Sequence, residues 1–257
     1  MGNEKNDNGY ENPGLYKLRN IGRIVLDAFY PPACVVCGKP LGEHAGAGVH
    51  DTCRRQLKPV EEPVCVKCGK HLQTEEIMCD DCKRYEHVFD QAVSVFEYND
   101  AIKKGIYRFK YKNKREYAST FAAAIAEGAG RLIKMWDPDV IVPVPMHEKK
   151  KRVRGYDQAE LLAKKTGELL DIPVDSDFLV RTRKTAPMKE VDKKGRRDNV
   201  KDAFEAEIGD GEEVYKSVLL VDDIITTGFT LDECAKVLKE TGVKEVKALT
   251  LCSGEGF

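Results

Sequence analysis

The sequence predicts an α/β fold in which helices flank a parallel sheet, preceded by a small cysteine-rich domain. Strand-like and helix-like patterns alternate from about residue 91 onward in this chain of 257 residues, which is typical of βαβ units. Seven of the nine cysteines lie between residues 34 and 82, in pairs whose spacing is typical of metal-binding turns. We therefore expect a disordered tail over 1–14, an amphipathic helix with a metal-binding module over 15–88, and the α/β domain over 89–257.

Apolar spacing and the positions of prolines predict the individual elements. Leu15 to Phe29 is amphipathic and stops before two prolines, so we expect a short helix there. Pro138 ends a stretch with a helical pattern, and prolines also stop the buried strand that begins at Val140. The expected helices span 15–29, 100–111, 116–135, 156–170 and 231–240, and the expected strands span 91–98, 140–145, 177–180, 216–221 and 245–251.

The composition indicates a cytoplasmic protein. Hydrophobic residues make up 42% of the chain and charged residues 33%, and no stretch has the roughly 18 consecutive apolar residues of a membrane span. The polar start from Met1 to Asn12 lacks the apolar segment of a signal peptide. In a reducing cytosol, paired cysteines favour metal binding over disulfides.

The cysteine-rich region is a duplicated module. Cys34-Val-Val-Cys37-Gly-Lys-Pro-Leu41 repeats as Cys65-Val-Lys-Cys68-Gly-Lys-His-Leu72, at an offset of 31 residues. Zinc takes four tetrahedral nitrogen or sulfur ligands, and each Cys-x2-Cys turn supplies two of them. We expect two closed, structural Zn²⁺ sites; a single zinc, or ligands exchanged between the halves, would also fit the pattern. The expected metal ligands are Cys34, Cys37, His50 and Cys53 in the first module and Cys65, Cys68, Cys79 and Cys82 in the second.

One strand-to-helix junction carries the strongest indication of function. Four apolar residues, Val218 to Val221, run into Asp222 and Asp223, and a loop rich in threonine and glycine then leads into a helix. In open parallel sheets, ligands bind at the carboxyl ends of the strands. Backbone N–H groups at a helix N-terminus suit a phosphate, and Gly228 lets the backbone approach it closely. Because carboxylates beside a phosphate need hydroxyl groups or a metal as partners, the pattern predicts a sugar phosphate ligand.

The run Val218-Leu-Leu-Val-Asp-Asp-Ile-Ile-Thr-Thr-Gly-Phe-Thr230 resembles the phosphoribosyl pyrophosphate (PRPP) motif of type I phosphoribosyltransferases. It lacks the Gly-Lys-Ser/Thr ending of a Walker A loop. The resemblance implies that the two acids take the ribose hydroxyls and that the loop cradles the 5′-phosphate. The alternative is an ordinary turn whose acids are solvated. The residues expected to bind PRPP are Val221, Asp222, Asp223, Ile225, Thr226, Thr227, Gly228 and Thr230.

Two basic segments are candidates for binding the pyrophosphate. Residues 147–156 hold five bases and one acid, and residues 181–201, which link two strands, have a net charge of +6. A basic loop at the carboxyl end of a strand fits a pyrophosphate clamp, and a long connection inside a compact domain is typical of an active-site lid. Charge alone also fits a solvated loop. The expected clamp and lid residues are Pro145, Met146, His147, Arg152, Arg154, Lys184, Thr185 and Arg196.

Together with the cysteine modules, Val142-Pro-Val-Pro-Met-His147 and Arg154-Gly-Tyr-Asp-Gln158, these segments resemble the ComF family of competence-associated phosphoribosyltransferase homologues, over about residues 20 to 252. Two positions depart from the family pattern: His50, often cysteine, and Met188, often glutamine. The resemblance implies a type I phosphoribosyltransferase-like parallel sheet behind an N-terminal double zinc ribbon. It also implies Mg²⁺-dependent transfer of phosphoribosyl to an unknown acceptor, and a role in DNA uptake. The implied catalytic residues are Asp222, Asp223, Lys184 and Arg196.

Two other functions stay open. Residues 103–116 are strongly basic and interleave the aromatic residues Tyr107, Phe109 and Tyr111, and basic grooves with aromatic platforms bind single-stranded DNA. For this segment we favour an amphipathic helix whose aromatic residues lie in the core. The ComF resemblance implies a competence helicase or the uptake machinery as partners. A PRPP-sensing regulator without catalysis would have the same pocket.

Overall fold

The computed structural model describes residues 31–42, 48–185, 195–209 and 214–254. The expected tail over 1–14, the expected helix over 15–29 and Met188 lie outside these residues. No helix within the described ranges combines the length and the apolar character that a membrane span requires.

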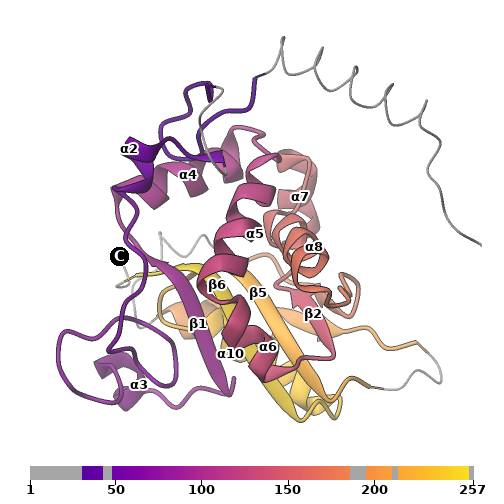
Figure 1. The fold of residues 1–257 in the computed structure, drawn as a ribbon. Coiled ribbons are helices and arrows are strands. Elements are labelled where there is room, and N and C mark those ends of the chain that lie inside the picture. Colours follow the sequence, from indigo (N-terminus) through magenta and orange to yellow (C-terminus); the bar gives the residue numbers. More distant parts are fainter. Residues whose placement is uncertain (1–30, 43–47, 186–194, 210–213, 255–257) are drawn as a thin grey trace, which may run out of the picture.

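The main sheet has four parallel strands in the order β1 (Gln91–Glu97), β6 (Glu245–Ser253), β5 (Ser217–Ile225) and β2 (Val140–Pro143). The two central strands are runs of apolar residues because helices cover both of their faces. The predicted parallel sheet flanked by helices is therefore confirmed, and Figure 1 shows the strands side by side.

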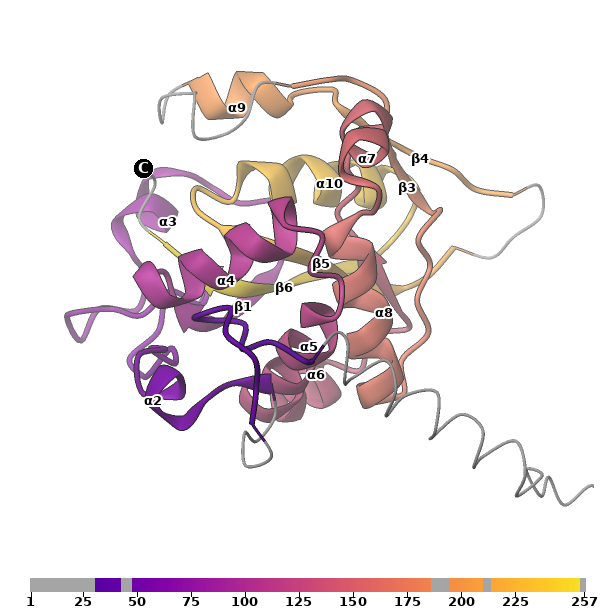
Figure 2. The ribbon, with the colours of Figure 1, turned by 90° about the horizontal axis from the view of Figure 1, so that it is seen from above.

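The sheet separates two hydrophobic cores. Side chains alternate along β5, so Leu219 and Val221 pack in one core while Val218 and Leu220 pack in the other. The first core also takes the apolar faces of α4 (Asp100–Tyr111), α5 (Tyr117–Gly128), α6 (Gly130–Trp136) and α8 (Gln158–Leu170). The second takes α10 (Phe229–Glu240). Figures 1 and 2 show α10 on the opposite side of the sheet from α5 and α8.

The structure corrects two of the predicted elements. The helix expected over 116–135 is two helices, α5 and α6, because the backbone leaves the helical region at Ala129 (φ −126°, ψ −9°), which lies between two glycines; glycine is a weak helix former. The strand expected over 177–180 does not join the parallel sheet. It is β3 (Leu179–Arg181), which pairs antiparallel with β4 (Phe204–Ala206) in a separate two-stranded sheet.

Two predicted loops also contain helices. The basic segment 147–156 forms α7 (Glu148–Arg154), and the long basic connection ends in α9 (Gly195–Val200), beside α10 (Figure 2). The His147 side chain accepts the N–H of Lys149 at the start of α7, and Gly155 ends the helix with a φ of 81°. Because no residue of α7 is buried, the helix has no apolar stripe for sequence periodicity to detect.

The two cysteine modules pack against different elements of the α/β domain. The first contains α2 (Asp51–Arg54) and packs on α4 and α5, where the Tyr117 hydroxyl donates to the Cys34 carbonyl over 3.1 Å. The second contains α3 (Asp80–Arg84) and packs against the edge strand β1, where the Ala92 N–H donates to the Lys67 carbonyl over 2.8 Å. Figure 1 shows both modules on the β1 side of the molecule.

Candidate functional site

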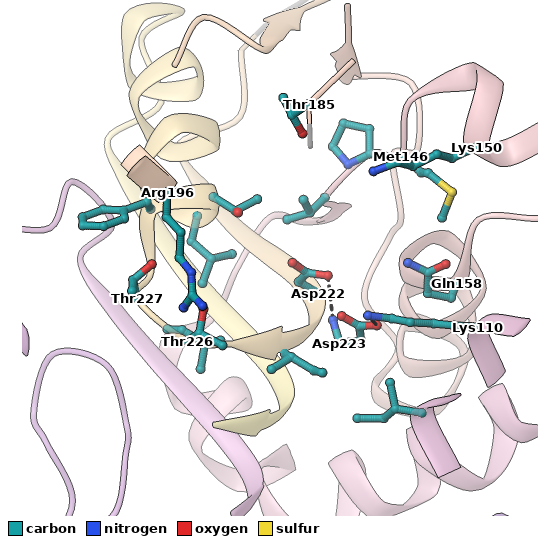
Figure 3. A pocket seen from close by; sticks show the side chains of 18 of the residues that line it. Lys110, Met146, Lys150, Gln158, Thr185, Arg196, Asp222, Asp223, Thr226 and Thr227 are labelled. Carbon is teal, nitrogen blue, oxygen red and sulfur yellow. Dashed lines mark hydrogen bonds and ion pairs between the residues drawn. The ribbon is translucent and has the colours of Figure 1, made fainter. Parts of the chain in front are cut away.

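A cavity of about 580 Å³ opens at the carboxyl ends of β5 and β2. Its walls come from the end of β5 and the following loop, from the residues after β2, from α4, and from residues near β3 and α9. Figure 3 shows Asp222 and Asp223 between the threonine loop and Arg196 on one side and Lys110, Gln158 and Met146 on the other. The main sheet thus brings distant segments to the edge where open α/β sheets bind ligands.

The paired acids lie inside β5, which continues to Ile225 and does not end at Val221 as expected. Asp223 is 5% exposed, and its Oδ2 lies 2.5 Å from the Lys110 ammonium. The Asp223 N–H donates to Asp222 Oδ1 over 2.7 Å. Burial and the neighbouring Asp223 carboxylate raise the pKa of Asp222 to about 8. Hydrogen bonds donated by a ligand would therefore stabilise the ionised form of Asp222, which burial and Asp223 disfavour.

Lys110 lines the site although it was not among the expected site residues. It lies near the end of α4, its side chain is 21% exposed, and its ammonium group reaches Asp223 on β5. Burial opposes its charge, yet the Asp223 carboxylate raises the pKa of the Lys110 ammonium above its ordinary value. In the sequence, Lys110 is one of several bases in a basic stretch, and its pairing with a distant aspartate leaves no local signal.

The aromatic residues of the α4 segment divide between core and surface. Phe109 is buried, as the favoured interpretation of an amphipathic helix requires, and so is Tyr117 at the start of α5. Tyr107 and Tyr111 are 52% and 56% exposed, their ring centroids lie 5.2 Å apart, and both line the cavity. The expectation that the aromatic residues of this segment lie in the core is therefore wrong for these two tyrosines, because they project from the opposite face of the helix.

The loop after β5 forms the base of the cavity. Residues Thr226 to Thr230 all line it, and Gly228 is the N-cap of α10 with a φ of 79°. A Cβ atom at Gly228 would lie 2.8 Å from the His87 ring, so both the backbone conformation and the space require glycine. The N-terminus of α10, with its unsatisfied N–H groups and the positive end of its dipole, therefore faces the cavity.

The opposite wall contains part of the predicted clamp. Pro145, Met146 and Arg154 line the cavity, and the Met146 N–H is held by Asp157 Oδ2 at 2.8 Å. Arg154 donates to the Gln158 side chain and lies 4.9 Å from the centre of the Tyr111 ring. Lys150 and Gln158 also line this wall, although neither was among the expected site residues; Gln158 ends the motif that begins at Arg154.

Three predicted clamp and lid residues lie away from the cavity. His147 caps α7 instead, and Arg152 and Lys184 are exposed and are not among the lining residues. A role for these residues in binding pyrophosphate therefore stays a prediction. Val221, which was expected to bind PRPP, is fully buried in the core beneath the acids.

Arg196 and Thr185 come from the long basic connection and do line the cavity. Arg196 is only 1% exposed, and Figure 3 shows it on the same side of the cavity as Thr226 and Thr227. Thr185 is 5% exposed and accepts a hydrogen bond from Arg181. The contact between α9 and α10 brings Arg196 to the cavity, and its predicted contact with the pyrophosphate stays a prediction.

The eight predicted metal ligands form two clusters. One contains Cys34, Cys37, His50 and Cys53, the other contains Cys65, Cys68, Cys79 and Cys82, and within each cluster the ligand atoms lie within 4.8 Å of one another. Zn–S bonds of roughly 2.3 Å in a tetrahedron place sulfur atoms about 3.8 Å apart, and Cys68 Sγ lies 3.6 Å from Cys79 Sγ. Both donor sets therefore fit Zn²⁺, and each cluster takes its four ligands from its own module.

His50 has the geometry of a zinc ligand. Its Nδ1 lies 3.4 Å from Cys37 Sγ, and its Nε2 lies 3.1 Å from the Pro40 carbonyl oxygen. A metal-bound histidine commonly donates its second ring N–H in this way, which fixes the ring. The histidine that replaces a cysteine in the first module thus presents the correct atom to the cluster.

Comparison with known proteins gives the family. The model of the double zinc ribbon domain matches residues 25–83, and the model of the phosphoribosyl transferase domain matches residues 116–256. Competence protein F of Haemophilus influenzae is 33% identical over 222 residues, which cover 85% of this chain and 96% of that protein. This chain belongs to the ComF family.

Other relatives of this ComF protein include ComFC of Bacillus subtilis, 30% identical over 78% of this chain and 82% of that protein. The DNA utilization protein YhgH of Escherichia coli K12 is 28% identical over 86% of this chain and 97% of that protein.

Proposed function

We propose that this ComF protein binds PRPP in the cavity at the end of β5 and transfers its phosphoribosyl group to an acceptor. One observation supports this most strongly: two adjacent carboxylates and the N-terminus of α10 share one cavity of about 580 Å³. A ribose 5-phosphate needs acceptors for its hydroxyls and N–H donors for its phosphate, and the two lie next to each other here. The double zinc ribbon over 15–88 would be a separate structural domain beside the transferase domain over 89–257.

Each wall of the cavity would have its own part in binding. The ribose 2′- and 3′-hydroxyls donate to Asp222 and Asp223, and N–H groups of Thr226 to Thr230 hold the 5′-phosphate, with Ile225 supporting the loop from the core. Arg196 lies next to that phosphate. The pyrophosphate lies toward Lys150 and Arg154, with the Met146 segment beneath it. These charged groups act by positioning and by charge compensation.

The reaction exchanges one bond at C1 of the ribose for another. The bond from C1 to the pyrophosphate oxygen breaks with its electron pair, the acceptor forms a bond to C1, and the acceptor loses a proton. Mg²⁺ keeps most of its waters and prefers phosphates and carboxylates, so Asp222 is the protein group that would hold it, and the ion would offset the charge of the leaving pyrophosphate.

Titration calorimetry with PRPP and Mg²⁺ tests this proposal. The wild-type protein is expected to bind PRPP, and the double variant Asp222→Asn with Asp223→Asn is expected to lose binding while it keeps its circular dichroism spectrum and its zinc content. Equal PRPP affinity in the double variant would refute the assignment of the site. Release of pyrophosphate from PRPP in the presence of candidate acceptors separates an enzyme from a PRPP-sensing regulator.

We further propose a role in DNA uptake in the cytoplasm, which the names of the relatives support, since they refer to competence and to DNA utilization. One observation favours direct contact with single-stranded DNA: Tyr107 and Tyr111 are exposed beside Lys103 and Arg154 at the rim of the cavity. Exposed aromatic rings among bases stack unpaired nucleotides. Binding that weakens as salt rises, and that Tyr107→Ala with Tyr111→Ala removes, would support this role. No binding at about 50 mM salt would leave a competence helicase or other uptake machinery as the only route to DNA.

A further inference from the structure

The second zinc ribbon touches the phosphate loop through one lysine. Lys70 follows Cys68 by two residues, yet its ammonium donates to the Thr226 carbonyl oxygen over 2.5 Å. The Lys70 side chain is 13% exposed, and Asp81 Oδ2 holds it from the other side at 3.3 Å. Asp81 lies between Cys79 and Cys82. Lys70 and Asp81 therefore both belong to the turns that supply the second cluster.

The direction of the Thr226 carbonyl decides where the next N–H points. A trans peptide bond is planar, so its C=O and N–H groups point in opposite directions. Because Lys70 holds the Thr226 oxygen on the side of the zinc ribbon, the N–H of Thr227 faces away from the ribbon. Thr226 and Thr227 both line the cavity, so this N–H is a donor for a phosphate there. Without Lys70, this peptide could rotate and present its oxygen to an anion.

The segment that follows the second cluster supports the other end of the same loop. Asp232, in the first turn of α10, accepts hydrogen bonds from His87 Nδ1 and from the Val88 N–H, each over 2.8 Å. The Tyr85 ring packs edge-on against Phe229 with centroids 5.2 Å apart. The start of α10 is thus fixed by packing and hydrogen bonds, and the Thr226–Thr227 peptide is fixed by a charged side chain from the zinc turn.

We propose that Lys70 is a positioning residue for the 5′-phosphate: it fixes the Thr226–Thr227 peptide, and the metal held in the second cluster fixes Lys70. This inference rests on the proposed binding of PRPP at this loop. It makes recognition of the 5′-phosphate depend on the second zinc site, whose ligands lie outside the cavity. The pyrophosphate end of PRPP lies toward α7 and does not depend on Lys70.

The duplicated module supplies a matched control. Lys39 occupies the position of Lys70 in the first module, and the two turns have the same backbone bonds: Cys34 N–H to the Lys39 carbonyl over 2.9 Å, and Cys65 N–H to the Lys70 carbonyl over 2.8 Å. The Lys39 side chain is exposed and lies in the module that packs on α4. Lys39→Met and Lys70→Met therefore remove the same charge from equivalent zinc turns, but only the second removes a contact to the loop.

The experiment measures the affinity of three ligands, PRPP, ribose 5-phosphate and inorganic pyrophosphate, for zinc-loaded full-length variants. Lys70→Met is expected to lower affinity for PRPP and ribose 5-phosphate roughly tenfold, the effect of losing one charged hydrogen bond. Its affinity for pyrophosphate, its zinc content and its melting temperature should stay near those of wild type. Lys39→Met should match wild type with all three ligands. Lys70→Arg, which keeps a charged donor, should recover part of the loss. If Lys70→Met does not fold, Lys70→Gln takes its place.

Three results would overturn the proposal, and each has a different meaning. Unchanged affinity of Lys70→Met for ribose 5-phosphate shows that the carbonyl contact does not prepare the loop. An equal loss for pyrophosphate indicates general disruption and not positioning. A wild-type protein that binds neither PRPP nor ribose 5-phosphate removes the proposed function itself, and this inference with it.

Discussion

Asp222→Asn is expected to make the protein more stable at pH 8 while it weakens PRPP binding. Burial and the adjacent Asp223 carboxylate raise the pKa of Asp222 from 3.8 to about 8, so the folded protein holds a proton at neutral pH that the unfolded chain has released. Stability falls as pH rises wherever the folded state binds more protons. The wild-type protein should therefore lose stability between about pH 4 and pH 8, and no further above pH 8.

The size of the effect follows from this interval. Each pKa unit corresponds to about 1.4 kcal/mol, so a shift of about four units would give roughly 6 kcal/mol as an upper limit. Water that enters the open cavity lowers this value, and we expect about 1–3 kcal/mol at pH 8. Asparagine carries no charge, and its Oδ1 can still accept the Asp223 N–H that Asp222 Oδ1 accepts over 2.7 Å. The substitution therefore removes the cost of the charge and keeps the local hydrogen bond.

Denaturant unfolding of both proteins at pH 6, 7, 8 and 9, in zinc-containing buffer, measures this difference. The advantage of Asp222→Asn should grow from pH 6 to pH 8 and then level off. Asp223→Asn is the matched control, and it should act in the opposite direction. It breaks the 2.5 Å pair with Lys110 and leaves a largely buried ammonium alone, which costs roughly 3 kcal/mol. If Asp222→Asn destabilised the protein at pH 8, or if its effect did not depend on pH, the conclusion that the fold raises the pKa of Asp222 would be refuted.

Two further predictions concern the loop and the first cluster. Gly228→Ala should destabilise the protein by about 1–2 kcal/mol and weaken PRPP binding, because the new Cβ would lie 2.8 Å from the His87 ring at a φ of 79°. Gly242 is the control, since it has a φ of 109° and open space around it. In the same denaturation assay, Gly242→Ala should show only the cost of the backbone conformation. His50→Ala should lower the zinc measured per chain by mass spectrometry, while His50→Cys should keep it, because a thiolate replaces the imidazole as the fourth ligand; equal zinc in all three proteins would show that His50 is not a ligand.

Sequence reasoning succeeded where the relevant contacts are local. The strand, the two acids, the threonine loop and the start of α10 are consecutive, so one stretch of sequence predicts their arrangement at the sheet edge. The cysteine turns are also local, and both predicted clusters form from the expected residues. Lys110 and Lys70 were missed for the opposite reason. Each reaches its partner on β5 or the loop from a distant part of the chain, and no pattern near either lysine marks it among its basic neighbours.

The missed elements have related causes. β3 and β4 are three residues each and, among the residues that the structure describes, pair with one another, so neither carries an alternating pattern long enough to reveal its partner. α7 is held by its caps and by its charges, with bases in its last turn, and such a helix has no buried face. Arg152 and Arg154 illustrate the consequence. They are two positions apart on α7, and this spacing turns one toward the cavity and leaves the other in solvent.

The positions of the two zinc modules suggest why a ComF chain joins them to a phosphoribosyltransferase domain. The first module holds α4, because Arg108 donates to the carbonyls of Val36 and Cys37 over 2.6 and 3.0 Å. Lys110, two residues further along α4, pairs with Asp223. The second module holds the loop after β5 through Lys70. The duplicated turns therefore differ in what they support: one fixes the helix that reaches Asp223, and the other fixes the loop next to the two acids. A small domain with little core of its own gains rigidity from metal cross-links. A site built from segments that are distant in the sequence needs such rigid support.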